Sequence, residues 1–190
     1  MSIIDPDIRK AETLPSRYYT DTATFESVIS SFGGNWHFAA HRSQLSFALP
    51  INNPLKEPML LTQDNGNVHC ISNVCTHRGM LVCTEPSDAK RLQCPYHGRI
   101  FSLDGQFRSM PEFDTVENSP TAADHLRSFP LAEWKGFLFN TISADDFESF
   151  IAKVEARVGW LPIEEFAHDS SRHREYSIDS NWALYVDNYL

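Results

Sequence analysis

The chain has 190 residues, of which 42% are hydrophobic and 22% are charged, the composition of an ordinary globular protein. Its formal net charge of −9 argues against nucleic acid or an anionic membrane as a partner. No run approaches the ~18 consecutive apolar residues of a membrane span, and residues 1–10 lack the apolar core of a signal peptide. We therefore expect a cytoplasmic protein.

Residues 1–34 are predicted to form an N-terminal arm. Ala11–Tyr19 is polar and contains a proline, so we expect a loop there. A short helix should follow, capped by Asp21 or Thr22 and running to Ser31, before a Gly-Gly pair that ends it. The apolar face of this helix comprises Phe25, Val28, Ile29 and Phe32.

From residue 35 to residue 142 the pattern changes to short apolar runs rich in residues that favour strands. Turn signals separate the runs, among them Asn52-Asn53-Pro54, residues 64–67 and Asp104-Gly105. The expected strands are Trp36–Ala40, Leu45–Leu49, Met59–Thr62, Val68–Asn73, Arg91–Cys94, Arg99–Leu103, Gln106–Arg108 and Glu133–Thr141. Many short strands at this spacing predict an antiparallel sandwich or a small barrel.

Residues 143–190 form a third segment, in which the apolar period becomes helical. Ala144–Val158 is expected to be a helix, and Arg172–Ile178 a strand. Asn181–Leu190 resembles the opening of a further helix, with Asp179 or the serine after it as the cap.

Two short segments hold the residues that carry chemistry, residues 75–77 (C-T-H) and 94–98 (C-P-Y-H-G). Each supplies one thiolate and one imidazole, in the pattern C-x-H, sixteen residues, C-x-x-H. Replacing two thiolates of a [2Fe–2S] cluster by neutral imidazoles removes negative charge, which raises the potential from about −400 mV to about −150 to +300 mV. We predict such a cluster. The predicted ligands are Cys75 and Cys94 on the inner iron and His77 and His97 on the outer iron.

A structural zinc site is the main alternative, because two cysteines and two histidines also form a zinc ligand set. Zinc fingers usually pair Cys with Cys and His with His, whereas each segment here is mixed, which favours the cluster. A coincidence of core cysteines and structural histidines is improbable, since the chain has only four cysteines. We expect Cys70 in the core and Cys83 packed beside the site. Structural roles are expected for His37, His41, His69, His125, His168 and His173.

The two motifs and their flanks resemble the Rieske domain of ring-hydroxylating oxygenase α subunits. The resemblance covers most of residues 35–190 and implies a mostly β fold. In such a fold a Rieske [2Fe–2S] domain of antiparallel strands is flanked by an N-terminal helical arm and the start of an α+β catalytic domain. The segments that carry the resemblance are residues 75–79 (CTHRG), 94–98 (CPYHG), Phe101, 103–105 (LDG), 134–140 (WKGFLFN) and 181–190 (NWALYVDNYL).

The resemblance also implies an activity. Intact members are iron-dependent mono- or dioxygenases that hydroxylate or demethylate a small organic substrate with O₂ and electrons from a ferredoxin or flavin reductase. Their mononuclear Fe(II) is held by two histidines and a carboxylate, which would lie beyond Leu190, so we expect no catalytic residue in this chain. By resemblance His97 would be the electron exit, and the intact enzyme would be a homotrimer. We expect the 190-residue chain to be a truncated N-terminal part, inactive alone.

The chain departs from the family pattern in places. Arg99 stands where the family often has tryptophan, and Ala183 where it often has lysine. High-potential Rieske proteins carry a disulfide between the ligand loops, and this chain has Met80 and Tyr96 at those positions, so we expect a potential toward the lower end of the range. A stand-alone Rieske ferredoxin, an electron carrier that needs only the β domain, is the alternative function.

Overall fold

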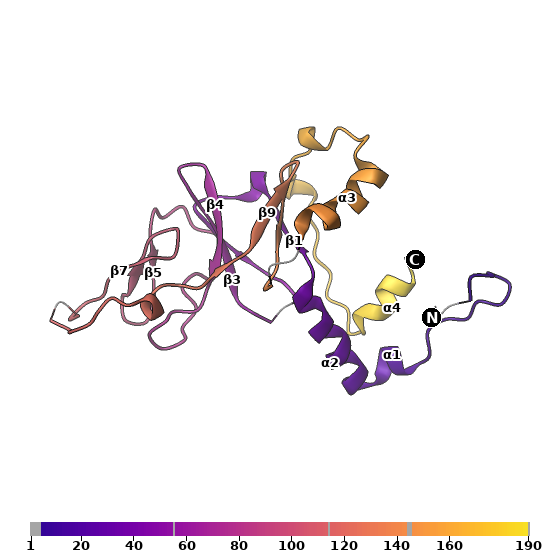
Figure 1. The fold of residues 1–190 in the computed structure, drawn as a ribbon, viewed down its shortest axis with the longest axis horizontal. Coiled ribbons are helices and arrows are strands. Elements are labelled where there is room, and N and C mark those ends of the chain that lie inside the picture. Colours follow the sequence, from indigo (N-terminus) through magenta and orange to yellow (C-terminus); the bar gives the residue numbers. More distant parts are fainter. Residues whose placement is uncertain (1–4, 55, 114, 144–145, 190) are drawn as a thin grey trace. The chain divides into compact units, whose positions relative to one another are not determined.

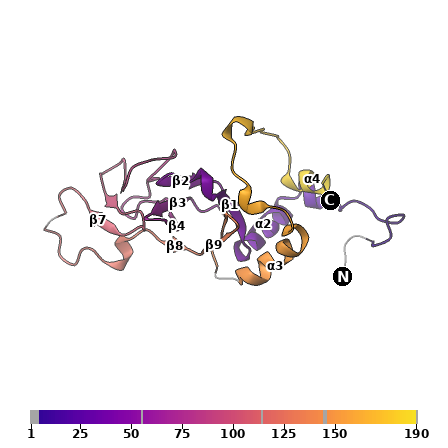
Figure 2. The same ribbon diagram turned by 90° about the horizontal axis from the view of Figure 1, so that it is seen from above.

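The computed structural model describes residues 5–54, 56–113, 115–143 and 146–189. The chain forms two compact units: Gly33–His168 is the larger, and Met1–Phe32 together with Asp169–Leu190 is the smaller. Figures 1 and 2 show the strands within the larger unit and the helices α1, α2 and α4 within the smaller. Among the described residues, no helix combines the length and the apolar character that crossing a membrane requires. The predicted boundaries after residues 34 and 142 stay a prediction.

The larger unit is built on a four-stranded antiparallel sheet, the central sheet, with strand order β2-β3-β4-β8. Its strands are β2 (Ala48–Ile51), β3 (Met59–Asp64), β4 (Asn67–Ser72) and β8 (Ser128–Phe129). Asn65 and Gly66 join β3 to β4 with φ of 50° and 84°, the left-handed pair that a two-residue hairpin turn requires. The strands predicted over 59–62 and 68–73 are therefore confirmed.

The prediction of a strand over Leu45–Leu49 is wrong in its first half. Arg42–Gln44 forms a 3₁₀ turn, in which the side chains of His41 and Gln44 cap each other's backbone, so β2 begins only at Ala48. β8 was not predicted, because two residues are too few to show an alternating pattern.

A second antiparallel sheet, the outer sheet, has the order β1-β10-β9. Its strands are β1 (His37–His41), β9 (Leu131–Trp134) and β10 (Phe137–Asn140). The single strand predicted over Glu133–Thr141 is wrong: the chain reverses at Lys135 and Gly136, which have φ of 49° and 85°. Lysine at positive φ is uncommon, so only the glycine signalled this turn in the sequence.

The third sheet, the distal sheet, has the order β5-β6-β7 and carries one of the two motifs. Its strands are β5 (Leu92–Gln93), β6 (Ile100–Phe101) and β7 (Phe107–Ser109). Gly105, with φ of 84°, turns the chain from β6 to β7 as the Asp-Gly pair predicts. In Figures 1 and 2 the labelled strands of this sheet lie at the end of the unit away from α3.

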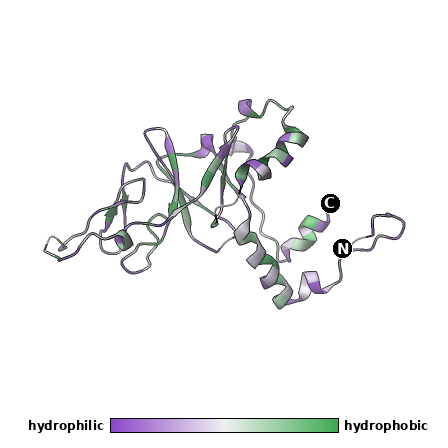
Figure 3. Ribbon diagram, viewed as in Figure 1, coloured by the Kyte–Doolittle hydropathy of each residue, from purple (hydrophilic) through white to green (hydrophobic). Residues whose placement is uncertain are grey.

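Two hydrophobic clusters hold the three sheets together, and β3 contributes to both because its successive side chains point to opposite faces. The first comprises Ala48, Leu60, Ile71, Cys75, Val82, Leu92, Cys94, Phe101, Leu103 and Leu126. The second comprises Ala40, Ile51, Met59, Leu61, Cys70, Phe129 and Leu138. Figure 3 shows the hydrophobic stretches within the strands in the middle of this unit. The expectation of a mostly antiparallel β fold is confirmed, with the central sheet buried on both faces.

Helix α3 (Phe147–Val158) packs on the outer sheet. The carboxylate of Asp146 caps it by accepting hydrogen bonds from the backbone N–H of Glu148 and of Ser149, at 3.1 and 3.3 Å. The ring centroids of Phe147 and Phe150 lie 5.6 and 5.8 Å from that of Phe139 in β10. The predicted helix is confirmed from Phe147 onward, whereas Ala144 and Asp145, at its predicted start, lie outside the described residues.

The smaller unit contains α1 (Arg17–Thr20), α2 (Thr22–Ser31) and α4 (Trp182–Asp187). The carboxylate of Asp21 accepts from the backbone N–H of Thr24 at 2.7 Å, so α2 begins where the sequence predicts. The loop predicted over Ala11–Tyr19 is wrong at its end, because α1 already begins at Arg17.

Two predictions on the other side of this unit are also wrong. No strand forms over Arg172–Ile178: these residues are exposed and pair with none of the strands that the described residues form. The cap of α4 is Asn181, whose side-chain oxygen accepts from the backbone N–H of Ala183 at 2.9 Å. The amide of Asn181 also donates to the carbonyl of Tyr19 at 3.0 Å. This second contact explains why Asn181, and not Asp179, caps α4. Leu190, at the end of the predicted helix, lies outside the described residues.

The hairpin of the outer sheet yields a testable prediction. A Cβ at Gly136 would lie 2.8 Å from Nε2 of His41, in a residue with φ of +85°. Gly136→Ala should therefore lower the free energy of unfolding by about 2 kcal/mol or more, measured by urea denaturation. In Gly66→Ala, φ is +84° but nothing lies within 4 Å of the added carbon, so the free energy of unfolding should fall only by the backbone strain of an alanine at positive φ. Gly34→Ala should lower the free energy of unfolding least. Equal stability of the Gly136 and Gly34 variants would contradict this.

Candidate metal centre: two loops of the same construction

The two motifs form loops with the same backbone hydrogen bonds. In the first loop (Cys75–Met80) the N–H of Cys75 donates to the carbonyl five residues later at 2.8 Å, and the N–H of Gly79 donates back to the carbonyl of Cys75 at 3.0 Å. In the second loop (Cys94–Arg99) the same two bonds run from Cys94 to Arg99 and from Gly98 to Cys94, at 2.8 and 3.0 Å. The sequence spacing of the two motifs thus corresponds to one structural unit used twice.

Each loop is closed at its base by an antiparallel pair. Val74 pairs with Leu81 below the first loop, and Gln93 in β5 pairs with Ile100 in β6 below the second. The glycine near the end of each loop has a left-handed backbone, with φ of +71° at Gly79 and +72° at Gly98. This conformation turns the chain back toward the cysteine that begins the loop, and any residue with a side chain would be strained at this position.

The two cysteines lie on the buried side of the loops, each 2% exposed and part of the same hydrophobic cluster. The thiol of Cys75 interacts with that of Cys94 and accepts hydrogen bonds from the backbone N–H of His77 and of Arg78. Burial raises the pKa of Cys75, the two N–H groups oppose this by favouring the thiolate, and the neighbouring Cys94 raises the pKa again. A metal that took both sulfurs would replace the thiol protons and stabilise paired thiolates.

The two histidines lie on the outer side. Their ring centroids are 4.8 Å apart, with His97 exposed and His77 half-buried. Nδ1 of His77 is itself buried and, among the described residues, makes no hydrogen bond. A buried polar atom without a partner is costly, and coordination to a metal would satisfy it. Burial lowers the pKa of His77, and the positive charges of His97, Arg78 and Arg99 lower it further, which favours the neutral imidazole that binds metals.

The residues fit a cluster of two irons better than a single ion. Among the described residues, no three His, Cys, Asp or Glu side chains are grouped so as to hold one metal ion. The four predicted ligands instead form two pairs, sulfur with sulfur and imidazole with imidazole, as a [2Fe–2S] cluster with two protein ligands per iron requires. A tetrahedral zinc ion would need all four donors around one point.

The first loop is held by a residue that the sequence analysis missed. Asn73 is 4% exposed, and its side-chain oxygen accepts from the backbone N–H of Val82 and of Cys83 at 3.1 and 2.9 Å. Its amide nitrogen donates to the carbonyl of Cys83 at 2.7 Å. A polar residue directly after a buried strand and two positions before the motif was the only available signal.

The remaining cysteines take the places expected of them. Cys70 is 2% exposed in the second cluster, and burial raises its pKa to about 12. Cys83 is half-buried and packs against the cluster that contains the two ligand cysteines. All four cysteines are free thiols, and the side chains of Met80 and Tyr96 are exposed.

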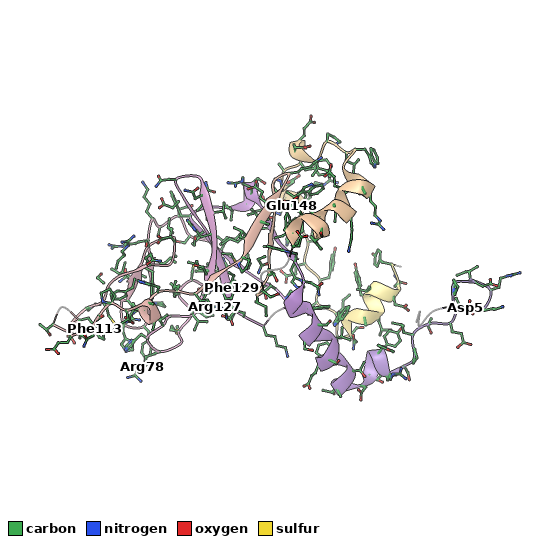
Figure 4. The ribbon with its side chains drawn as sticks, viewed as in Figure 1. Asp5, Arg78, Phe113, Arg127, Phe129 and Glu148 are labelled. Carbon is green, nitrogen blue, oxygen red and sulfur yellow. The ribbon has the colours of Figure 1, made fainter. Side chains whose placement is uncertain are left out.

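The surface beside His77 lies at the end of the larger unit opposite α3. Figure 4 places Arg78, the residue after His77, and Phe113, whose ring centroid is 6.2 Å from that of His77, at the same end and away from Glu148 in α3. On the other loop Tyr96 stacks on His97, with ring centroids 3.8 Å apart. His168 and His173 belong to different units, and we assign them no role at this site.

Paired loops of this construction on antiparallel sheets define an iron–sulfur domain of the two-cysteine, two-histidine class. The model for the Rieske [2Fe-2S] domain matches residues 35–130. The chain belongs to this family.

Relatives of known activity match nearly the whole chain. It is 30% identical over 191 residues to the carnitine monooxygenase oxygenase subunit of Escherichia coli K12, covering 96% of this chain and 50% of that protein. It is 27% identical over 203 residues to the chloroplastic choline monooxygenase of Beta vulgaris, covering 98% of this chain and 44% of that protein. A quaternary ammonium Rieske monooxygenase solved with L-carnitine has a TM-score of 0.80 at 25% identity, covering 94% of this chain and 53% of that one. The chain thus spans about half the length of these relatives.

The Asn73 contacts predict a strong effect of one substitution. Asn73→Ala would leave the backbone groups of Val82 and Cys83 with fewer partners in a buried place, at a cost of about 2–3 kcal/mol in the free energy of unfolding. Asn67→Ala, at an exposed position of β4, should change it by less than about 0.5 kcal/mol. Urea denaturation of both variants measures the difference, and equal values would show that the contacts around Asn73 do not stabilise the first loop.

Proposed function

We propose that the chain binds a [2Fe–2S] cluster through Cys75 and Cys94 on the inner iron and through His77 and His97 on the outer iron. The observation that carries this is the pairing itself, with two buried thiols on one side of the loops and two imidazoles on the other. The orphan Nδ1 of His77 supports it independently. When bound, such a cluster accepts and releases one electron at a time.

The residues around the site would exclude water, stabilise the thiolate and provide the electron exit. The buried cysteines and their hydrophobic cluster exclude water from the sulfur side. The N–H groups of His77 and Arg78 point at the sulfur of Cys75 and favour its anionic form. His97 is exposed, so its ring is the shortest way between the cluster and a partner at the surface. We therefore assign His97 as the electron exit.

The whole protein is, in this proposal, the oxygenase component of an enzyme that hydroxylates or demethylates a small organic substrate with O₂. Electrons would come from a ferredoxin or flavin reductase, and the intact enzyme would be a cytoplasmic homotrimer. The relatives named for carnitine and choline monooxygenase favour a small quaternary ammonium compound as the substrate class. The mononuclear Fe(II) would be held by a part of the relatives' length that this chain does not span.

A stand-alone ferredoxin is the weaker candidate. The Rieske model accounts for residues 35–130, yet the oxygenase relatives match 96% and 98% of the chain. The match therefore includes the segments on both sides of the β domain, residues 1–34 and 143–190, which a bare electron carrier would not require.

Reconstitution with iron and sulfide tests the ligand assignment. The purified chain should take up about two irons and two acid-labile sulfides and show visible absorption, as the [2Fe–2S] formula requires. Cys75→Ser and Cys94→Ser should each abolish uptake, whereas Cys83→Ser, a half-buried cysteine in contact with the same cluster, should retain it. Loss of iron in the Cys83 variant alone, or zinc in place of iron, would sink the proposal.

A change of ligand type tests the outer iron. His97→Cys adds a thiolate, and its negative charge opposes reduction, so the midpoint potential should fall toward the about −400 mV of all-cysteine clusters. His173→Cys, at an exposed position in the smaller unit, is the matched control and should leave the potential unchanged. A redox titration followed by visible absorption gives both values, and an unmoved potential in the His97 variant would mean that this histidine is not a ligand.

A further inference from the structure

Arg99 is a charged residue that the fold buries. Its side chain is 4% exposed, although arginine almost never lies so deep without a partner. The position directly follows the second motif, and its carbonyl accepts the hydrogen bond from the N–H of Cys94 at 2.8 Å. Its guanidinium lies over the ring of Phe107, 4.7 Å from the centroid. A buried cation of this kind is costly unless it is paired, so its contacts need an explanation.

The guanidinium connects three segments that are distant in sequence. Nη1 donates to the hydroxyl of Thr76, between the predicted ligands of the first loop, at 2.6 Å. Nη2 donates to the carboxylate of Asp124 at 2.8 Å. The hydroxyl of Thr76 in turn donates to the carbonyl of Asp124 at 2.9 Å. The first loop, the second loop and the 3₁₀ turn Ala122–Asp124 are therefore tied together through one side chain.

The environment of Asp124 favours its charged form. The N–H of Thr121 and the guanidinium of Arg99 hold the pKa of Asp124 below its usual value, against the effect of burial. The side chain of Asp124 is 20% exposed, whereas that of Arg99 is 4% exposed. Water therefore screens the carboxylate more than the guanidinium, so the positive charge is the less screened member of the pair.

We propose that Arg99 is a positioning residue that locks the two ligand loops together and that its buried charge raises the reduction potential of the cluster held between them. This inference rests on the proposed function. Reduction adds one electron to the cluster, so a nearby cation stabilises the reduced form relative to the oxidised form. The hydrogen bond to Thr76 holds that cation against the loop that contains Cys75 and His77.

The two roles are separable by substitution. Arg99→Met removes the charge and the hydrogen bonds, and Arg99→Lys keeps the charge but loses the two-pronged contact. Thr76→Val leaves Arg99 and its charge in place but removes both hydrogen bonds of the threonine hydroxyl, to Arg99 and to the carbonyl of Asp124. Asp124→Asn keeps an acceptor for Arg99 but removes the opposing negative charge. Arg91→Met is the matched control, since it deletes the same charge from an exposed side chain of the same unit.

The measurements are iron and sulfide content and the midpoint potential of the reconstituted 190-residue chain, titrated with dithionite. Arg99→Met should lower the ratio of reduced to oxidised cluster at a fixed ambient potential by on the order of tenfold. Asp124→Asn should raise that ratio, and Arg91→Met should leave it unchanged. Arg99→Lys and Thr76→Val should lose cluster faster than the parent on incubation with a chelator, while the potential of Arg99→Lys stays close to that of the parent.

Each outcome decides the matter. Loaded Arg99→Met with the potential of the parent would overturn the electrostatic role. If Arg99→Met takes up no cluster, the potentials of Asp124→Asn and Arg99→Lys test the electrostatic role instead. That role would be overturned by an unchanged potential in Asp124→Asn. It would also be overturned if the potential of Arg99→Lys fell by as much as is expected for removal of the charge. Chelator resistance of Thr76→Val equal to that of the parent would overturn the locking role. Failure of the parent chain to take up iron would overturn the proposed function itself and this inference with it.

Discussion

The structure depends on one backbone arrangement used twice. The N–H of a cysteine donates to the carbonyl five residues later, and the carbonyl of the same cysteine accepts from the N–H four residues later. The closure requires a glycine with φ near +70°, which is supplied by Gly79 in one loop and Gly98 in the other. It turns each cysteine into the core and leaves each histidine outside. The sheets provide the paired residues below each loop and the hydrophobic cluster behind the thiols, so the fold can be understood as the support for these two turns.

Local signals in the sequence account for much of this. Apolar runs between strong turn residues predict β3 and β4, and the cap Asp21 predicts the start of α2. The failures occur where the deciding feature is not local. Lys135 adopts positive φ because β9 and β10 pair across it, and residues 172–178, whose pattern predicts a strand, pair with none of the described strands. At the site, the motifs predict the four ligands, but the contacts of Asn73 with Val82 and Cys83, and of Asp124 with Arg99, form only through tertiary packing.

The division into a sulfur side and an imidazole side has a consequence for electron transfer. In the proposed function the thiols on the inner iron are enclosed by hydrophobic side chains, which shield that iron from a partner. The exposed ring of His97, stacked on Tyr96, offers the short route instead. The asymmetry on which the proposed cluster assignment depends therefore also supports His97 as the proposed electron exit. Electron transfer by this chain then depends on what contacts the surface around His97.

The loops must keep their separation although no disulfide joins them, since all four cysteines are free thiols. Arg99 offers a different solution, a cross-link made of hydrogen bonds from the end of one loop to Thr76 in the other. A disulfide would fix the geometry without adding charge, whereas a guanidinium fixes the geometry and adds a positive field at the same place. Loop geometry and reduction potential are then coupled through a single side chain, with Asp124 opposing the field. A substitution at Asp124 can adjust the potential while leaving an acceptor for the cross-link, which substitution of a ligand cannot do.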